Sequence, residues 1–339
     1  MSDPAAPLAA PARVRLPDAA PLLERRAARL AALAEGHAAP EWVRLLSRIA
    51  WGQARAARQI PLSPLSPIAP LSASSTLSPS GGEGRGKGVA PLASRDPLSL
   101  APAGGEGRGE GVAPLAGIPR DAAWRRMLAM IVDAAGAPGL PAPARDALSW
   151  LAAAPADRLE PLADAVLAGT VPGDLAACAP FVGAALEAWL ASLAAQLGPG
   201  ATAASGDEGA CPACGGPPVA GTIGAEDRLR WLACARCATA WNVPRVRCVA
   251  CETATGPEYF HLDSDPGAKA EACPDCRAYV KLFDLAKRPG SEPAADDAAT
   301  LALDLLLAEE GFHRAGPNVY VGAGEASSPA ATDLTHPSP

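Results

Sequence analysis

Eight of the nine cysteines in this sequence occur as four Cys-x-x-Cys pairs. The pairs are Cys211/Cys214, Cys234/Cys237, Cys248/Cys251 and Cys273/Cys276. Nineteen residues separate the first pair from the second and 21 separate the third from the fourth, whereas only ten lie between the second and the third. Two residues between cysteines allow one tight turn to direct both sulfurs at a single ion about 2.3 Å away. The array therefore predicts two tetrahedral four-thiolate metal sites.

The spacing favours a pairing of neighbours, the first pair with the second and the third with the fourth. About twenty residues suffice for a short hairpin that brings the second cysteine turn opposite the first. A module of about 30 residues cannot build a sufficient hydrophobic core, so a bound ion would take the place of that core. An interleaved pairing, first with third and second with fourth, is the alternative. It uses the same eight ligands in one entwined unit.

Four thiolates suit zinc and rubredoxin-like iron almost equally, so the sequence predicts two metal ions that are either iron or zinc. The competing hypothesis is redox catalysis by a dithiol. A thioredoxin-like dithiol needs one Cys-x-x-Cys at a helix N-terminus after a strand, which four pairs between short β-prone stretches do not match. The ninth cysteine, Cys178, has no partner in the sequence and is predicted to be a buried small hydrophobic residue.

The charge pattern argues against nucleic-acid binding. The net charge is −7, and the cysteine-rich region from Ser205 to Arg288 carries ten Lys/Arg against eleven Asp/Glu. A surface with no excess of positive charge attracts phosphate weakly. A nucleic-acid-binding zinc ribbon is therefore the least favoured hypothesis. It rests on a small cluster of Arg230, Arg245 and Arg247 near Trp241.

No catalytic constellation is visible in the sequence, so we predict that the protein is not an enzyme. The four histidines do not occur in nucleophile-elbow or metalloprotease patterns. The carboxylate pairs Asp296-Asp297 and Glu309-Glu310 are interpreted as solvated helix faces. The apolar stretch from Ala179 to Leu197 contains Glu187 and shows a helical stripe. It therefore predicts a buried helix and no membrane insertion. The first residues do not resemble a signal peptide, which favours a cytoplasmic protein.

The sequence pattern changes along the chain from helical to β-prone segments, and this change predicts an α+β fold. An N-terminal all-helical domain is followed by two small rubredoxin-like or zinc-ribbon-like β lobes and a C-terminal helix. A near-exact repeat, GGEGRGKGVAPLA then GGEGRGEGVAPLA, interrupts the helical part. Its composition cannot bury enough apolar surface to order it, so we predict a disordered insert.

We predict six segments. They are a flexible N-terminus at 1–21; a helical domain at 22–198 with the insert at about 60–117; a first four-cysteine lobe at 205–242; a second at 243–290; a C-terminal helix and extension at 291–322; and a disordered tail at 323–339.

The stretch CPACGGPPVAGTI…LRWLACARCATAWNVPRVRCVACE…AEACPDCRAYVKLFD resembles the formate dehydrogenase accessory protein (FdhE) family. The resemblance includes all four cysteine pairs, Trp241-Asn242, and Arg245 and Arg247 before the third pair. The helical stretches RRAARLAALAEG, IPRDAAWRRML and APFVGAALEAWL are also similar to that family. The resemblance covers about three-quarters of the chain. The departure from the family pattern is the Gly/Pro/Ser-rich insert.

The resemblance implies a cytoplasmic maturation factor, or chaperone, for respiratory formate dehydrogenase. It implies a helical domain, two rubredoxin-like metal lobes whose ligands are the eight paired cysteines, and binding to the catalytic subunit of that enzyme. The alternative is a rubredoxin-like redox or iron-delivery protein that uses the same thiolate sites. The sequence is also compatible with a homodimer.

Overall fold

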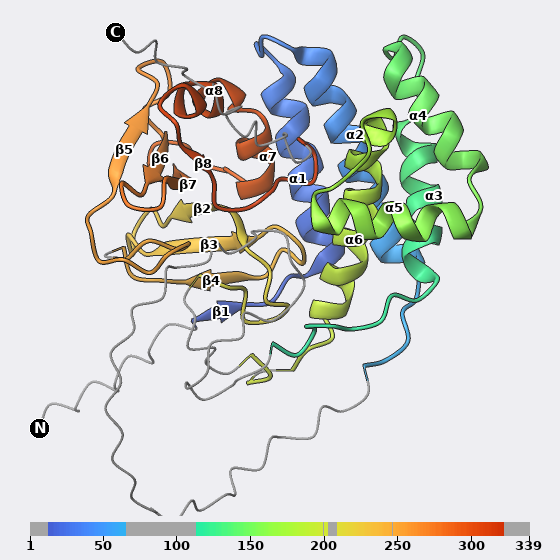
Figure 1. The fold of residues 1–339 in the computed structure, drawn as a ribbon, viewed down its shortest axis with the longest axis horizontal. Coiled ribbons are helices and arrows are strands. Elements are labelled where there is room, and N and C mark those ends of the chain that lie inside the picture. Colours follow the sequence, from blue (N-terminus) through green and yellow to red (C-terminus); the bar gives the residue numbers. More distant parts are fainter. Residues whose placement is uncertain (1–12, 66–112, 199, 203–208, 246, 322–339) are drawn as a thin grey trace, which may run out of the picture.

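The computed structural model describes residues 13–65, 113–198, 200–202, 209–245 and 247–321. A layer of helices and a mixed eight-stranded sheet lie side by side in it, with the helices α1 (Ala19–Ala34) and α7 (Pro293–Ala298) between them (Figure 1). The predicted α+β fold class is confirmed. Residues 66–112 of the insert and the tail from residue 322 onward lie outside the described residues, as do the predictions made for them.

The helical layer has six α-helices and one 3₁₀ turn. They are α1 (Ala19–Ala34), α2 (Pro40–Gln59), α3 (Ala123–Ala135), α4 (Ala142–Ala153), α5 (Ala156–Ala168), η1 (Gly173–Cys178) and α6 (Ala179–Ala194). Alanine and leucine dominate these segments and favour helix. The end of α5 is set by Gly169, which adopts a left-handed φ of 69°.

The helix α6 lies at the centre of the helical layer and is buried on nearly every side. The continuous stretch Gly173–Ala194 is long and apolar enough to cross a membrane, but 61% of its most apolar window is buried inside the protein. The predicted buried helix is therefore present. Its one buried acid, Glu187, accepts from Arg26 of α1 at 2.7 Å and from Gln53 of α2 at 3.0 Å. Tyr320 donates to Gln53 at 2.5 Å, which ties the end of the described chain to the helices.

Each cysteine lobe contributes three strands to the sheet. The first lobe supplies β2 (Pro218–Ile223), β3 (Arg230–Cys234) and β4 (Ala240–Asn242); the second supplies β5 (Glu258–His261), β6 (Ala268–Ala272) and β7 (Ala278–Asp284). The strand order is β1-β4-β3-β2-β7-β6-β5, with β8 (His313–Arg314) paired to β7. The two lobes thus form a single sheet, which the cysteine spacing did not reveal.

The joint between the lobes is the parallel pairing of β2 with β7, in which Gly221 lies opposite Leu282. Since β2 also pairs with β3, Gly221 is enclosed on both sides. A Cβ at Gly221 would lie 2.6 Å from the Trp231 carbonyl oxygen and 2.8 Å from Leu282 Cδ2. Glycine is required here because β3 and β7 approach β2 closely from its two sides.

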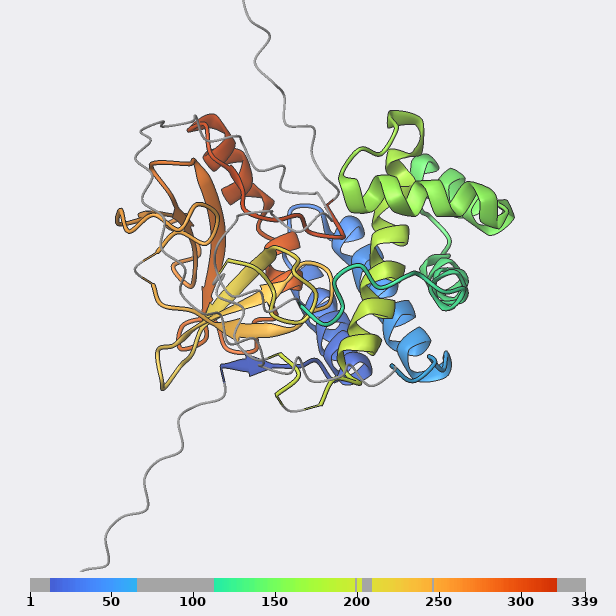
Figure 2. The ribbon, with the colours of Figure 1, turned by 60° about the horizontal axis from the view of Figure 1, so that its bottom comes forward.

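The first described residues differ from the prediction of a flexible N-terminus at 1–21. Val14 and Arg15 form the strand β1, which pairs antiparallel with Trp241 and Ala240 of β4 at the edge of the sheet (Figure 2, blue arrow). The Arg15 guanidinium also stacks 3.6 Å above the ring of Trp231. The segment 13–21 therefore belongs to the folded part, because β4 offers it an open strand edge.

The predicted single C-terminal helix is two helices, α7 (Pro293–Ala298) and α8 (Leu301–Glu309). The Thr300 hydroxyl donates to the Asp296 carbonyl at 2.8 Å, where the chain changes direction between them. The interpretation of Asp296 and Asp297 as a solvated helix face was wrong, because both side chains are fully buried. Asp296 pairs with Arg29 and Arg288, each at 2.7 Å. Glu309 and Glu310 are exposed, as predicted.

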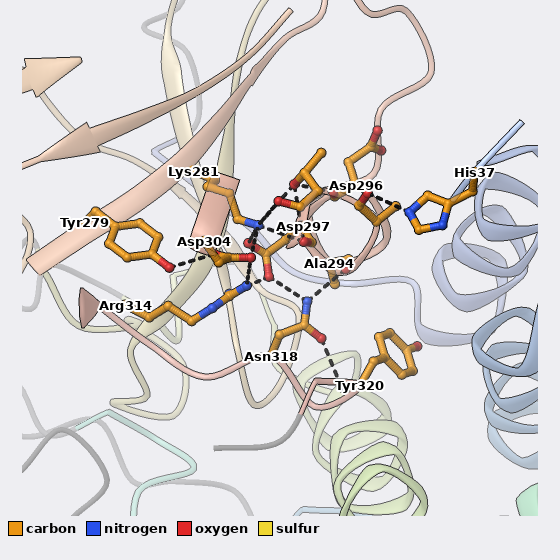
Figure 3. A network of polar contacts seen from close by, with 12 residues as sticks. His37, Tyr279, Lys281, Ala294, Asp296, Asp297, Asp304, Arg314, Asn318 and Tyr320 are labelled. Carbon is orange, nitrogen blue, oxygen red and sulfur yellow. Dashed lines mark hydrogen bonds and ion pairs between the residues drawn. The ribbon is translucent and has the colours of Figure 1, made fainter. Parts of the chain in front are cut away.

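A buried ionic network joins the C-terminal helices to the sheet (Figure 3). Lys281 of β7, whose side chain is fully buried, lies 3.0 Å from Asp297 and 2.8 Å from Asp304. Arg314 of β8 contacts the same two carboxylates at 2.6 and 2.8 Å, and Asn318 donates to Asp297. Two cations and two carboxylates balance each other, which is the condition for burying such groups.

Candidate metal centres

All four Cys-x-x-Cys turns close with the same backbone hydrogen bond. In each turn the N–H of the first cysteine donates to the carbonyl of the residue five positions later. These bonds are Cys211 to Gly216 (2.8 Å), Cys234 to Thr239 (2.9 Å), Cys248 to Thr253 (3.0 Å) and Cys273 to Ala278 (2.8 Å). The bond folds the turn back so that both sulfurs of a pair point to one side.

The residue after the second cysteine of each pair has a left-handed backbone. Its φ is 73° at Gly215, 56° at Ala238, 60° at Glu252 and 62° at Arg277. Only the first of these is a glycine, so three turns hold an L-residue in a conformation that favours glycine. The repetition of this conformation in four places, three of them at a steric cost, indicates that the fold requires both sulfurs of each pair to face a common point.

The first cluster consists of Cys211, Cys214, Cys234 and Cys237. The sulfurs of Cys211 and Cys237 lie 3.6 Å apart, and those of Cys214 and Cys234 lie 3.4 Å apart. All four residues are buried, with exposed fractions of 0–7%. They belong to one apolar core that extends to Leu46 of α2 and Leu186 of α6.

The second cluster consists of Cys248, Cys251, Cys273 and Cys276. The Cys248 and Cys276 sulfurs lie 3.7 Å apart, and those of Cys251 and Cys273 lie 3.8 Å apart. Cys273 is buried, Cys248 and Cys276 are half-buried, and Cys251 is exposed. Among the described residues, none of these four sulfurs lies in either apolar cluster of the protein.

These distances fit a metal ion in each cluster. Ligands about 2.3 Å from a tetrahedral centre are about 3.8 Å from one another, and the measured pairs span 3.4–3.8 Å. Four sulfurs form a soft donor set that suits zinc or iron. The clusters also decide the pairing: the first Cys-x-x-Cys lies with the second and the third with the fourth. The interleaved alternative is wrong.

Each cluster contains one cysteine whose surroundings favour the thiolate. Burial opposes ionisation of Cys234, yet hydrogen bonds from Cys211, Cys214 and Cys237 hold its pKa well below its usual range. Burial likewise opposes ionisation of Cys273, and the backbone N–H groups of Cys276 and Asp275 lower its pKa. Both are the first cysteine of the second turn in their lobe. This parallel follows from the duplicated turn geometry.

Arg277 connects the second cluster to the C-terminal helix α8. Its guanidinium donates to the carbonyls of Glu310 and Gly311 and stacks 3.7 Å above the ring of Phe312. Its own carbonyl accepts from the His313 N–H at 2.9 Å. The last turn of the second lobe is thereby fixed to the end of α8.

The arginines singled out for nucleic-acid binding do not form one exposed cluster. Arg230 is 3% exposed and is paired with Glu271 at 3.1 Å. Arg245 donates to the Arg228 carbonyl, and Arg247 is exposed. Arg230 is therefore unavailable to a phosphate. Cys178 is buried as predicted, and burial raises the pKa of its thiol to about 11, which keeps it protonated at neutral pH.

Sequence reasoning missed the segment that covers the first cluster. Leu115, at the far end of the insert, is 2% exposed and donates its N–H to the carbonyl of Ala213, between Cys211 and Cys214. The other end of the insert is fixed as well, because the Leu65 N–H donates to Gln196 at 3.0 Å. The available signal was the apolar VAPLA that ends each repeat.

Comparison with known proteins covers almost the whole chain. The FdhE N-terminal family model matches residues 11–207, the FdhE central domain matches residues 210–245 and the FdhE C-terminal domain matches residues 246–321. The boundary between the last two falls between the two cysteine clusters.

Individual relatives agree with the family models. A protein described as "Protein FdhE homolog" from Pseudomonas putida is 34% identical over 320 residues, which are 90% of this chain and 89% of the relative. The homolog from Cronobacter sakazakii is 32% identical, with 90% and 89% covered. The crystal structure of the FdhE protein from Pseudomonas aeruginosa matches with a TM-score of 0.69 at 29% identity, covering 91% of this chain and 98% of that one. The chain therefore belongs to the FdhE family.

Proposed function

We propose that this protein is a cytoplasmic maturation factor that binds the catalytic subunit of respiratory formate dehydrogenase before that enzyme becomes active. The observation that carries the proposal is the pair of four-cysteine clusters in an FdhE family member. In this proposal the protein performs no catalysis of its own. It presents a surface whose shape depends on the two lobes.

Each cluster would bind one iron or zinc ion through its four cysteines. The ion supplies positive charge that allows four sulfurs to be thiolates at neutral pH, and it cross-links two turns that are 19 or 21 residues apart. The backbone N–H groups of Arg236 and Ala250 donate to the sulfurs of Cys234 and Cys248, each at 3.3 Å. Such bonds stabilise thiolate ligands and orient them.

The shared sheet explains why both clusters would matter for one surface. The strands β2 and β7 join the lobes edge to edge, and β1 and β8 extend the sheet with residues from the two ends of the described chain. A lobe that lost its ion would therefore disturb a neighbour through backbone hydrogen bonds. The catalytic subunit would meet the two lobes as one rigid unit.

The test is co-purification of the tagged protein with the catalytic subunit. We expect the wild type to retain the subunit and to contain two ions per chain by elemental analysis. Cys214→Ser should lose at least one ion and most of the bound subunit. Cys178→Ser is the matched control, because Cys178 is buried outside both clusters. Failure of the wild type to retain the subunit would refute the proposal, as would full retention by Cys214→Ser.

A redox or iron-delivery role is the second candidate, favoured by the exposure of Cys251. An absorption spectrum of protein prepared without added zinc separates the two candidates. Thiolate-to-iron charge-transfer bands that bleach on reduction would support it, and a colourless zinc protein would contradict it.

A further inference from the structure

The two clusters differ most in the access they give to their sulfurs. In the first cluster every cysteine is at most 7% exposed, and the turn at Ala213 is covered by Leu115. In the second cluster Cys251 is exposed and two more cysteines are half-buried. An ion held by four enclosed sulfurs can leave only if the protein opens, whereas an ion beside an exposed sulfur can be reached by another donor.

A small cleft opens beside the second cluster. Cys248 and Cys273 form part of its wall, together with Val249, Thr255 and Pro257. Because the cleft reaches one cysteine from each turn, a donor that enters it meets both halves of the cluster. Another cleft touches Ala235 and Arg236 but none of the first-cluster cysteines.

The wall of the cleft is largely apolar but contains one buried charged pair. Arg230 and Glu271 line it, and their buried ion pair has two N–O distances of 3.1 Å. The buried Arg230 Nε has no hydrogen-bond partner among the described residues. A buried donor without a partner is costly, so Arg230 favours a water molecule or another hydrogen-bond acceptor beside it.

An exposed loop forms part of the wall of this cleft. The residues 254–256 are exposed, and Thr255 is hydrogen-bonded to Asp275 at 2.8 Å. Asp275 lies between Cys273 and Cys276, so its hydrogen bonds with Thr253 and Thr255 fasten the loop that follows the first turn of the lobe to the second turn. Exposed hydrogen bonds are weak restraints, because water can replace them. The residues 254–256 belong to no strand, so their movement would leave the sheet intact.

We propose that the second cluster exchanges its metal ion through this cleft, whereas the first cluster keeps its ion for as long as the protein stays folded. The inference rests on the proposed metal binding and adds a division of roles between the clusters. In each step a donor of the incoming chelator replaces one cysteine thiolate, and the released sulfur takes up a proton. The ion leaves with its oxidation state unchanged.

The experiment follows zinc release from protein that contains two zinc ions per chain, with 4-(2-pyridylazo)resorcinol as the coloured chelator. We expect two phases of one ion each, with the first at least tenfold faster. Iodoacetamide added after the first phase should alkylate the second-cluster cysteines, as mapped by mass spectrometry of peptides. Release of both ions in one phase, or alkylation of Cys234 and Cys237 in the first phase, would overturn the inference.

Two threonine variants test the route. Thr255→Val removes one of the hydroxyls that hold the loop to Asp275, and we expect the fast phase to accelerate at least threefold. The matched control is Thr239→Val, which removes the hydroxyl that contacts the Cys237 sulfur at 3.2 Å in the first cluster. It should leave the fast phase unchanged. An unchanged rate in Thr255→Val, or equal acceleration in both variants, would contradict exchange through the cleft.

The outcomes separate this inference from the proposed function. If the two ions leave together, the proposed difference in exchange between the clusters is wrong, but the proposed maturation function is not contradicted. Protein that binds no zinc or iron contradicts both.

Discussion

The two cysteine lobes share one turn geometry, but their surroundings differ. The first cluster lies within the apolar core that continues into α2 and α6, and it is closed by Leu115. The second cluster lies outside that core, and its lobe is held to the C-terminal helices by Lys281 and by the guanidinium of Arg277. The local sequence thus determines how a cysteine turn folds, while the packing around it determines how exposed the ligands are. The predictions below test this contrast.

The largest expected effect is the loss of a ligand from the enclosed cluster. Cys237→Ser should remove the first ion, which contributes on the order of 10 kcal/mol in comparable zinc peptides. This approaches the whole stability of a typical domain, about 5–15 kcal/mol. We therefore expect the variant to lose cooperative unfolding of both the first lobe and the helical layer. Cys276→Ser should unfold the second lobe and disturb the first lobe only where β2 pairs with β7.

Tryptophan fluorescence measures this difference directly. All seven tryptophans precede Val243, so they report on the helical layer and the first lobe and not on the second lobe. The urea transition seen by fluorescence should shift strongly in Cys237→Ser and little in Cys276→Ser. Equal shifts in the two variants would contradict the contrast between the clusters.

The buried ionic network should give the next largest effect. Lys281→Met leaves Asp297 and Asp304 with only one of their two cations, and we expect a loss of about 3–5 kcal/mol. The control is Arg228→Ala, which breaks an ion pair whose arginine side chain is 49% exposed. That variant should lose at most about 1 kcal/mol. Far-UV circular dichroism during urea unfolding measures both, and a loss below about 1 kcal/mol in Lys281→Met would contradict the prediction.

Substitutions at the left-handed position after each cysteine pair should change the stability less. Their sign should depend on whether glycine is introduced or removed. Ala238→Gly and Glu252→Gly relieve a strained backbone, and we expect each to stabilise its lobe by up to about 1 kcal/mol. Gly215→Ala introduces the same strain and should destabilise the first lobe by about 1 kcal/mol. Thermal unfolding of the metal-loaded proteins is the measurement. A stabilised Gly215→Ala would show that the turn does not require this backbone.

The smallest expected effect concerns the pair at the joint between the lobes. The Arg228 guanidinium hydrogen-bonds to Asp284 and lowers the pKa of that carboxyl to about 2. The folded state therefore prefers the ionised carboxylate. Its stabilisation is complete above the ordinary Asp pKa of about 3.9 and is lost as the pH falls through about 2.

We expect Asp284→Asn to cost at most about 1 kcal/mol at pH 7. The difference from wild type should shrink when urea unfolding is repeated below about pH 4. A difference that stays constant down to pH 3 would indicate a cause other than this charge.

The cysteine clusters could be predicted from the sequence because their determinants are local. The Cys-x-x-Cys spacing sets the turn, and the separation of about twenty residues sets the hairpin, so the grouping of the four pairs follows. The helices of the N-terminal half were also predictable, since alanine, leucine and a glycine stop such as Gly169 act within a few residues.

The remaining features depend on contacts between residues far apart in the sequence. β1 exists only because β4 offers an edge, and the pairing of β2 with β7 depends on the absence of a side chain at Gly221. Asp296 and Asp297 resemble a solvated pair until Arg29, Arg288, Lys281 and Arg314 converge on them. The exposure of Cys251 likewise depends on what packs beside it.

Because both ends of the insert are fixed, we expect the fold to depend little on the length of the insert. Leu65 is held at the end of the α6 region through Gln196, and Leu115 is held at the first cysteine turn. Under the prediction that the residues between these anchors are disordered, adding or removing some of them changes only the entropy of closing a loop. Deleting one 13-residue copy of the repeat would then alter that term by roughly 0.3 kcal/mol. We therefore expect both lobes to keep their structure when whole repeats are gained or lost.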